Sequence, residues 1–591
     1  MSEKEVLPLP GTLTPHPRRS RSPKILLGTL LALATLINFH ESIPGVDQAR
    51  SLVSSIPWNR EVGPEGLVEH DGRWLYDEAW FKSHVECPAQ PAPIYPKIIW
   101  NMTHDDKRVS VERYAQSVQI PTESFDDNGE PEEDPRWQPF VDFQKWLIAT
   151  FPLANEYAEV EYINTLGILA TFKGSEPSLK PLLLMSHYDV VPVPSSTLDR
   201  WTHPPFSGHN DGQYIWGRGA ADDKTLLVAQ WEAITHLLES GFEPRRTIIT
   251  SHGFDEEEVF ARRGQGRIAP FLEDRYGQNG LLMVIDEGAG TTDDMYGAPF
   301  ALPGMDEKGY MDILALGTKG GHSSVPPKHS GIGVMSQIVS GLEDNVFPIK
   351  LTPSSPLLTS MMCAAKHSPS FPKSYAKLLK SEGPSSWPKL AKLIASESRS
   401  RRAMVGTTTA FDVIHGGVKV NALPELVTGL VNFRIDFAES IESTQKHVTR
   451  ILGTVAEKNE LMFSAFDGKD GDLDLGGKYV KVELLGAPLE PAPRTPTSGG
   501  VWDLFAGTVR AVLPGPDGAE RIVTPFASTG NTDCKMYYNL TKHVYRFMGA
   551  PSNAGSGVHT VDERASIDAH YAILGWVHAI IQNADAYDGE E

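Results

Sequence analysis

Short apolar stretches alternate with longer amphipathic segments over much of the chain. Four mostly apolar stretches have the length and composition of strands buried on both faces of a sheet: 167–172, 182–186, 247–251 and 281–285. Longer segments carry apolar residues at helical spacing: 139–152, 225–239, 268–276, 500–512 and 567–581. Because strands and helices alternate in this way, the pattern predicts an α/β domain built on a parallel or mixed sheet.

The pattern changes between residues 306 and 490. Segments there have the pattern of strands at 310–317, 426–435 and 479–485, and of helices at 331–342 and 444–458. A strand–helix–strand–strand–helix–strand order is typical of a small α+β (ferredoxin-like) domain with helices on one face of an antiparallel sheet. The Lys/Ser-rich residues 368–402 predict an inserted helical excursion.

The chain is therefore organised as one α/β domain interrupted by a second, smaller one. We predict a linker and entry segment at 40–110, followed by the first part of the larger domain at 111–305. The inserted domain occupies 306–490, and the larger domain resumes at 491–585. The Pro-rich residues 488–496 form the crossing back to it.

The N-terminus has the layout of a secretory signal or a signal-anchor. Residues 25–39 form an uncharged, mostly apolar run behind four basic residues: Arg18, Arg19, Arg21 and Lys24. At a rise of about 1.5 Å per residue this run spans about 22 Å, which is short for a membrane core of about 30 Å and favours a cleaved signal peptide. The lack of an Ala-x-Ala-like site after the run favours an uncleaved anchor instead. A buried core helix is the third alternative.

We favour the anchor, because thin early secretory membranes tolerate short spans. Residues 1–24 would then form a basic cytosolic tail, 25–39 the transmembrane segment, and the bulk of the chain would be lumenal. Two Asn-x-Ser/Thr sequons, at Asn101 and Asn539, agree with a lumenal body and are candidate glycosylation sites.

Composition excludes several classes of protein. The 591 residues include 54 Lys and Arg against 75 Asp and Glu, which gives a formal charge of −21 and argues against a nucleic-acid binder. Hydrophobic residues make up 40% and charged residues 22% of the chain, as in folded proteins. Three cysteines are too few for a disulfide framework or a Cys-based zinc site, although one bridge with a spare thiol is possible.

Ligand-capable side chains cluster where the predicted strands of the larger domain end. Three strands run into acidic or His-containing motifs, and a fourth motif begins a helix: His187-Tyr188-Asp189, Asp255-Glu256-Glu257, Asp286-Glu287-Gly288, and GRGAADDK at 217–224. Ligands bind at the carboxyl ends of strands in open α/β sheets, so these motifs are expected to meet in one crevice. One His and several carboxylates suit zinc, cobalt or manganese, and five or six ligands suit two ions that share a bridging carboxylate.

Each motif alone has an ordinary explanation. A single His-x-Asp is usually a chance or surface pair, Asp-Asp-Lys an N-capped helix start, a Glu run a solvated face, and Asp-Glu-Gly a turn. Their joint occurrence at strand ends and a helix start favours a metal site. Within it, Asp189 can orient His187 through the other ring nitrogen. Of the paired acids, one would ligate while its neighbour removes a proton from water.

These motifs resemble those of the M20 family of co-catalytic zinc peptidases, and most closely its carboxypeptidase S branch. Later segments fit the same family: GGHSSVP at 320–326, NALP at 421–424, GNTD at 530–533 and YNLTKHVYRF at 538–547. The resemblance covers roughly residues 110–583. It implies a zinc-exopeptidase-like catalytic domain with an inserted lid or dimerisation domain.

The resemblance also implies a set of site residues. Two zinc ions per subunit would be held by five residues, with Asp222 bridging: His187, Asp222, Glu257, Asp286 and His559. Three further residues would act in catalysis, as general base, orienting partner of His187 and donor to the scissile carbonyl: Glu256, Asp189 and His322. Asn421 and Arg434 would bind the carboxylate of the substrate. His559 follows from the resemblance alone, since spacing does not select it among 19 histidines.

One departure concerns the paired acids. The family usually has a small, glycine-containing turn after the two glutamates, whereas here EVFARR follows at 258–263. Either a residue is inserted after the pair, or the register shifts and Glu257 and Glu258 take the two roles. The upstream strand and the distance from Asp222 favour Glu256 as base and Glu257 as ligand.

The resemblance implies a di-zinc metallocarboxypeptidase that hydrolyses the C-terminal peptide bond of short peptides. The alternative is an N-acyl-amino-acid amidohydrolase, which needs the same metals and the same carboxylate clamp. A non-catalytic binding relative is disfavoured because every matched position is filled. We expect a vacuolar membrane or lumen location reached through the secretory pathway, and a homodimer is possible because some branches of the family dimerise through the inserted domain.

Overall fold

The computed structural model describes residues 67–70, 73–76, 85–258, 262–317, 320–381, 383–466 and 478–589. The predicted cytosolic tail and transmembrane segment, residues 1–39, lie outside this part of the chain. Among the described residues, no helix has both the length and the hydropathy needed to cross a membrane. The chain divides into two units, Met1–Leu75 and Tyr76–Glu591. Strands β1 (Leu67–His70) and β2 (Arg73–Tyr76) pair with each other.

A ten-stranded mixed sheet forms the larger domain. Eight of its strands follow the order β20-β11-β21-β9-β5-β8-β4-β3, and two short strands pair beside them. The bounds are β3 Glu159–Ile163, β4 Gly167–Phe172, β5 Leu182–His187, β8 Ile248–Gly253, β9 Met283–Thr292, β10 Phe300–Ala301, β11 Gly304–Glu307, β19 Ile522–Val523, β20 Phe526–Ser528 and β21 Val544–Pro551. Strands β8, β5, β9 and β21 run parallel to one another, whereas β4 runs antiparallel to both of its neighbours, β3 and β8. The predicted mixed sheet is confirmed.

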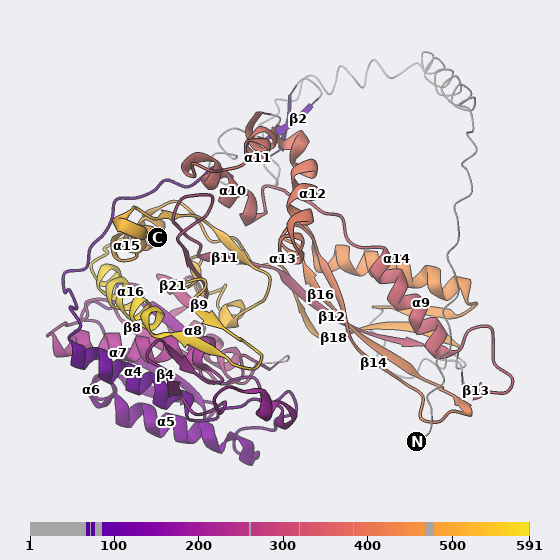
Figure 1. Cartoon of the computed structure of the whole chain (residues 1–591), viewed down its shortest axis with the longest axis horizontal. Coiled ribbons are helices and arrows are strands. Elements are labelled where there is room, and N and C mark those ends of the chain that lie inside the picture. Colours follow the sequence, from indigo (N-terminus) through magenta and orange to yellow (C-terminus); the bar gives the residue numbers. More distant parts are fainter. Residues whose placement is uncertain are drawn as a thin grey trace, which may run out of the picture. The chain divides into compact units, whose positions relative to one another are not determined.

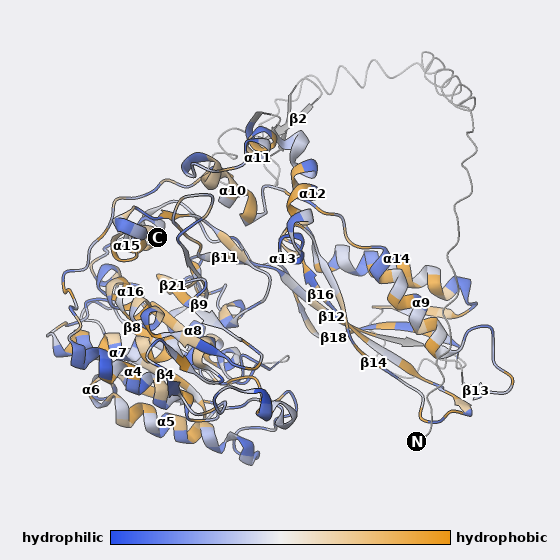
Figure 2. Cartoon of the chain, in the orientation of Figure 1, coloured by the Kyte–Doolittle hydropathy of each residue, from blue (hydrophilic) through white to orange (hydrophobic). Residues whose placement is uncertain are grey.

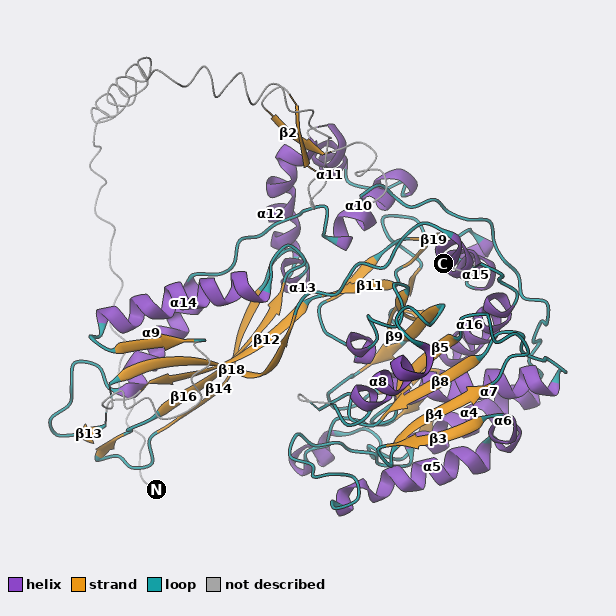
Figure 3. Cartoon of the chain, turned by 180° about the vertical axis from the view of Figure 1, so that it is seen from behind, coloured by secondary structure: helices purple, strands orange, loops and turns teal. Residues whose placement is uncertain are grey.

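Helices cover both faces of this sheet, which explains why its central strands are apolar throughout. Leu182 and Leu184 belong to the same buried cluster as Trp231 of α7 (Thr225–Glu239) and Ile573 of α16 (Ile567–Asp585). Leu183, one residue on, packs in a second cluster with α8 (Gln265–Tyr276). Further helices of this domain surround the strands (Figure 3): α4 His104–Val118, α5 Gln138–Thr150, α6 Pro152–Tyr157 and α15 Gly500–Val512.

A five-stranded sheet forms the inserted domain, in the order β14-β16-β12-β18-β17. Its elements are β12 Gly309–Gly317, α9 Gly331–Asp344, β14 Thr408–Gly416, β16 Val427–Ile435, α14 Ile441–Lys458, β17 Met462–Ala465 and β18 Tyr479–Leu489. Helices α9 and α14 pack on one face of this sheet (Figure 1). The antiparallel pairing of β14, β16, β12 and β18 is the predicted ferredoxin-like arrangement.

The inserted domain is held together by the apolar faces of its strands and helices. Buried and half-buried residues alternate in β16, and α14 has both hydrophobic and hydrophilic residues (Figure 2). Every second residue of β16 is buried against the helices. Strand β14 has no counterpart among the predicted segments. It lies at the sheet edge and most of its residues are exposed or half-buried, so its sequence lacks a strong apolar period.

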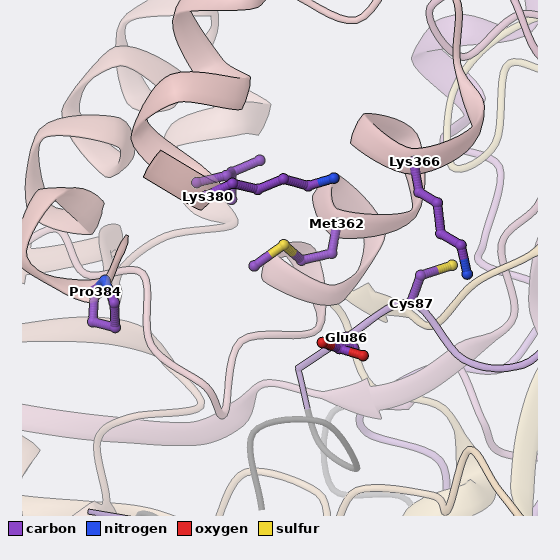
Figure 4. Close-up of a pocket in the computed structure, with 7 residues that line it drawn as sticks. Glu86, Cys87, Met362, Lys366, Lys380 and Pro384 are labelled. Carbon is purple, nitrogen blue, oxygen red and sulfur yellow. The ribbon is translucent and has the colours of Figure 1, made fainter. Parts of the chain in front are cut away.

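The predicted helical excursion is an insertion between α9 and β14. Its described residues form the α-helices α10 Pro356–His367, α11 Lys373–Ala376, α12 Trp387–Glu397 and α13 Arg399–Ala403, with short turns between them. A disulfide joins Cys363 of α10 to Cys87 of the entry segment, and the third cysteine, Cys534, is a buried thiol. Beside the bridge lies a pocket of about 490 Å³, which is lined by Met362, Lys366 and Lys380 among others and contains no predicted site residue (Figure 4).

Removal of this disulfide should destabilise the fold while sparing the site. The bridge closes a loop over a sequence separation of 276 residues, so a Cys87→Ser, Cys363→Ser double variant should lose about 2–5 kcal/mol of unfolding free energy. Urea unfolding measures the loss, and the metal content of the folded variant serves as the control. A change below about 0.5 kcal/mol would show that the bridge does not constrain the unfolded chain.

Candidate metal centre

The ends of three parallel strands bring the predicted ligands to one edge of the ten-stranded sheet. Strand β5 ends at His187, β8 ends two residues before Asp255, and β9 carries Asp286 and Glu287. Because β5 pairs in parallel with both β8 and β9, the three segments emerge on the same side. The Asp222 segment lies directly before α7. The motifs that the sequence analysis expects to meet therefore lie at one edge of the sheet.

Two groups of side chains have the spacing of metal ligands. One consists of His187, Glu256 and Glu287, and the other of His187, Asp222 and Glu257; within each group the ligand atoms all lie within 4.8 Å of one another. All of these side chains are buried or half-buried. Nitrogen and carboxylate oxygen are donors that suit zinc and related divalent ions.

Asp222 lies between two imidazoles in the manner of a bridging carboxylate. Its Oδ1 is 3.1 Å from Nε2 of His187, and its Oδ2 is 3.2 Å from Nε2 of His559. The same His559 nitrogen is 2.9 Å from Oε2 of Glu257. His559 is thus placed by the fold beside residues more than 300 positions earlier in the chain.

The electrostatics of the cluster also fit bound cations. Burial raises the pKa of Glu256 and of Glu287 well above the usual range. Hydrogen bonds that the His559 ring donates to Asp222 and Glu257 raise the pKa of His559 to about 10. Burial alone would lower the pKa of His187, but its acidic neighbours raise it well above its ordinary value. Burial thus favours the neutral forms of these acids, and bound divalent ions would favour the charged forms instead.

Asp189 holds this cluster together from behind. It is fully buried, and Nδ1 of His187 lies 3.0 Å from its backbone oxygen and 3.3 Å from its Oδ1. Its carboxylate also accepts hydrogen bonds from the backbone N–H groups of Glu256, at 3.2 Å, and Glu257, at 3.0 Å, and from the Ser124 hydroxyl at 2.8 Å. Asp189 therefore contacts the imidazole of His187 through its backbone and its side chain, and its carboxylate holds the backbone of the paired acids.

A bulge in β9 decides which acid of the Asp286-Glu287 pair enters the cluster. In the pairing with β21, Arg546 lies opposite Asp286, and the next residue lies opposite Ala289, so Glu287 and Gly288 have no partners. Bulges of this kind turn a side chain to the other face of a strand. Gly288 has a φ of +137°, and a Cβ there would lie 2.8 Å from Cβ of Arg546, so glycine is required.

Asp286 belongs to neither ligand group. Its carboxylate accepts a hydrogen bond from the Cys534 thiol at 3.2 Å, and the side chain is buried. Glu287 lies in a ligand group instead, with Oε1 3.6 Å from Nε2 of His187. The sequence analysis did not select Glu287, because regular strand alternation, which the bulge interrupts, gives no reason to prefer it.

Comparison with known proteins agrees with this geometry. The model of peptidase family M20/M25/M40 matches residues 183–583. The chain is 38% identical to carboxypeptidase S of Saccharomyces cerevisiae, over 84% of this chain and 88% of that protein. The chain belongs to the M20 peptidase family.

One further relative is similar in sequence, and two solved structures are similar in fold. The chain is 31% identical to the human N-fatty-acyl-amino acid synthase/hydrolase PM20D1, over 81% of this chain and 89% of that protein. The dipeptidase Dug1p of Saccharomyces cerevisiae has a similar fold, with a TM-score of 0.56 at 15% identity over 82% of this chain and 97% of that one. The M20 family metallo-carboxypeptidase Sso-CP2 of Sulfolobus solfataricus has a TM-score of 0.53 at 18% identity, over 82% and 100%.

The order of the three glutamates in this M20 peptidase follows from their partners. Glu256 and Glu257 each enter a ligand group, whereas Glu258 pairs with Arg263 of the same loop. Asp255 is also turned toward this loop, where it accepts hydrogen bonds from the backbone of Arg263 and Gly264. Glu256 and Glu257 therefore lie among the candidate ligands, and Glu258 does not.

Glu563 joins the two loops that carry Asp222 and His559, and the sequence analysis did not select it. It is 1% exposed and pairs with Arg218. Its Oε1 accepts hydrogen bonds from three backbone N–H groups at 3.0, 3.0 and 3.3 Å: Gly219, Ala221 and Asp222. Because His559 is four residues earlier, Glu563 fixes the position of one loop relative to the other.

A Glu563→Gln variant should therefore bind metal more weakly without losing its fold. Loss of an outer partner of a metal ligand typically costs about 10–100-fold in metal affinity, and we expect this range here. Competition with a zinc chelator measures the affinity, and thermal melting of the metal-free protein checks the fold. The matched variant is Asp562→Asn, because Asp562 contacts Thr202 and not the Asp222 loop. Equal affinities for the two variants would contradict the role of Glu563.

The predicted residues of the inserted domain fall into two places. His322 and Asn421 are exposed and adjacent, since β13 (Gly321–His322) pairs with β15 (Ala422–Leu423). Arg434 is at the other end of β16, where it donates to Oδ1 of Asn531 at 2.9 Å and lies over the ring of Tyr310. The nine residues of β16 span about 30 Å, so Asn421 and Arg434 do not meet within one chain.

The two sequons are accessible. Asn101 is exposed ahead of α4, and Asn539 is exposed in a turn before β21. The disulfide between Cys87 and Cys363 agrees with folding in an oxidising compartment, where such bonds form and persist.

Proposed function

We propose that this M20 peptidase is a di-zinc carboxypeptidase that removes the C-terminal residue from short peptides. The observation that carries the proposal is the position of Asp222 between His187 and His559, with a second acid beside each imidazole. Five residues would hold the two ions: His187, Asp222, Glu257, Glu287 and His559. Glu287 replaces Asp286 in this set, because the bulge in β9 turns Asp286 toward Cys534.

The chain's own residues have distinct tasks in this reaction. When bound, the two ions supply Lewis acidity that activates water and polarises the scissile carbonyl. Glu256 removes a proton from the attacking water and delivers it to the leaving nitrogen. Asp189 keeps His187 in its orientation. Arg434 binds the free carboxylate of the substrate through its fork of donors, which makes the enzyme an exopeptidase.

The assignment of Glu287 makes a prediction that separates two neighbouring acids. Glu287→Gln should lower kcat/KM by more than about 100-fold, since loss of an outer partner alone costs about 10–100-fold. Asp286→Asn should lower it less than about tenfold, because Asn can still accept the hydrogen bond of Cys534. Steady-state kinetics and zinc content at matched protein concentration measure both. The reverse order of effects would restore Asp286 as the ligand.

The test of the function is hydrolysis by the purified full-length protein, with and without metal. We expect cleavage of N-acetyl-Gly-Leu, loss of activity on treatment with a chelator, and recovery on addition of zinc. Metal analysis of the active protein should give two ions per chain. Activity that survives complete removal of metal would refute the proposal.

A second candidate is hydrolysis of N-acyl amino acids. It is favoured by the similarity to PM20D1, and it would use the same ions and the same Arg434. The comparison of N-acetyl-Gly-Leu with N-oleoyl-leucine separates the two, because both present a C-terminal leucine carboxylate and differ only on the acyl side. A higher kcat/KM for the oleoyl compound would favour the second candidate.

The surroundings of the enzyme form a further part of the proposal. The disulfide and the exposed sequons at Asn101 and Asn539 support a lumenal, glycosylated catalytic domain, and the relation to carboxypeptidase S suggests a vacuolar enzyme. We propose that residues 25–39 anchor the chain in the membrane, and that 111–305 and 491–585 form the catalytic domain interrupted by the lid at 306–490. Membrane fractionation before and after alkaline extraction tests the anchor.

We also propose that the chain forms a homodimer through the lid. Three valines next to His322 and Asn421 are almost fully exposed, at 80, 101 and 99%: Val325, Val418 and Val420. Apolar side chains of this exposure are costly unless a partner covers them. Within one chain, His322 is separated from Arg434 by the length of β16. In a dimer, His322 of one copy would instead approach the metal site of the other copy. Light scattering after gel filtration tests the dimer.

A further inference from the structure

An apolar pocket of about 180 Å³ opens beside the metal centre. Three of its lining residues are chain neighbours of the proposed ligands: Ala221 precedes Asp222, Gly288 follows Glu287, and Val558 precedes His559. The floor is formed by α16, on which Ala569 is 4% and Ile573 1% exposed. The pocket therefore lies close to the place where the scissile bond would lie.

The chemistry of this pocket selects for apolar groups. None of its lining residues is charged, and all except Thr225 and Ser552 are apolar, most of them glycine or alanine. Two glycines let the wall of the pocket pack closely. A Cβ on Gly290 would lie 1.9 Å from the carbonyl oxygen of Ala550, and one on Gly555 would lie 3.0 Å from Cβ of Ala221, so neither position has room for a larger residue. Burial of an apolar group here would be favoured in proportion to the area removed from water.

We propose that this pocket binds the side chain of the residue on the acyl side of the scissile bond. The inference rests on the proposed carboxypeptidase function. In that function the carboxylate of the leaving residue is held by Arg434, which belongs to β16 of the lid. The pocket is lined by residues 221–290 and 548–573 alone, which all belong to the other domain. A substrate would bind with its carboxylate at Arg434 and its scissile bond at the two ions. Its acyl side would then extend toward this pocket.

The size of the pocket limits the group that it takes. An apolar cavity of about 150 Å³ holds a benzene ring, whereas drug-sized ligands occupy about 300–1,000 Å³. At about 180 Å³ the pocket fits one leucine or phenylalanine side chain and is too small for a long fatty-acyl chain. The enzyme should therefore prefer peptides with a medium-sized apolar residue before the last one.

Two variants change the pocket in opposite directions. Ala554→Leu adds three carbons to a lining residue and should fill it, whereas Met548→Ala removes a lining side chain and should enlarge it. Asn553→Leu is the matched control, because it introduces the same leucine next to Ala554 at an exposed position that does not line the pocket. Metal content and thermal melting of all three show whether each variant is folded.

The experiment measures kcat/KM of the full-length enzyme for N-acetyl-X-Leu, with X as Gly, Leu, Phe or Trp, and for N-acetyl-Gly-Z, with Z as Leu or Phe. Ala554→Leu should lower the Phe/Gly ratio at X at least tenfold, as expected when methylenes are misplaced in an apolar pocket. Met548→Ala should raise the Trp/Gly ratio at X. Asn553→Leu should change neither ratio, and preference at Z should stay the same in every variant.

The outcomes distinguish this inference from the function on which it rests. If the wild-type enzyme cleaves none of these peptides, the proposed function fails. If it cleaves them and Ala554→Leu changes preference at X no more than Asn553→Leu does, the pocket is not the acyl-side subsite. A change of preference at Z instead of X would assign the pocket to the leaving residue and overturn the inference. Met548→Ala decides the matter if Ala554→Leu does not fold.

Discussion

A Glu256→Gln enzyme should keep its metal ions and hydrolyse N-acetyl-Gly-Leu about 10²–10⁴-fold more slowly than the wild type. General base catalysis contributes an effect of this size, and the amide of glutamine cannot accept the proton. Glu256 lies in a ligand group with His187 and Glu287, and burial raises its pKa well above the usual range. The loss should appear in kcat more than in KM, because proton removal belongs to the chemical step.

The neighbouring acid provides the matched control for this experiment. Glu258→Gln changes the same functional group two residues later, where the side chain pairs with Arg263 and enters neither ligand group. We expect it to retain activity within about tenfold of the wild type. If Glu258→Gln were the inactive variant and Glu256→Gln the active one, the register of the paired acids would be shifted by one or two residues, and the assignment of the base would be wrong.

Asp222→Asn should abolish activity by removing the carboxylate that both ions share. The two oxygens of Asp222 face different imidazoles, so one substitution weakens both metal positions. Asparagine keeps the shape of the side chain but carries no charge and offers only one oxygen. Lewis-acid activation is worth several kcal/mol, and each 1.36 kcal/mol is a factor of ten, so the rate should fall by about 10³-fold or more.

Metal content and melting temperature measure this effect independently of activity. The wild type should melt at a higher temperature as zinc is added, because a ligand that binds only the folded state stabilises it. In Asp222→Asn the zinc-dependent rise should largely disappear, while the melting temperature of the metal-free protein stays close to that of the wild type. A variant that still bound two ions and gained the same stabilisation would show that Asp222 is not the bridge.

Much of the fold follows from periodicity in the sequence. Helices 225–239 and 500–512 were predicted with the bounds that α7 and α15 have, because their apolar faces are long and regular. The mixed sheet follows from short apolar strands between such helices. Strand β14 was missed because an exposed edge strand has little apolar alternation.

The site was less predictable from the sequence for specific physical reasons. His187 and the paired acids were selected because they directly follow apolar strands. Glu287 was not, because a bulge that places it depends on Gly288 fitting against Arg546, a contact between strands far apart in the sequence. The selection of His559 needed the family resemblance, and Glu563 was not selected. Both act through contacts across more than 300 residues.

The most direct test of the account is a crystal structure of the zinc-loaded protein with anomalous data collected at the zinc edge. The account predicts two peaks about 3.5–4 Å apart, with Asp222 between them. One ion should be bound by His187 and Glu287 and the other by Glu257 and His559. A single peak, or two peaks that do not share Asp222, would contradict the account.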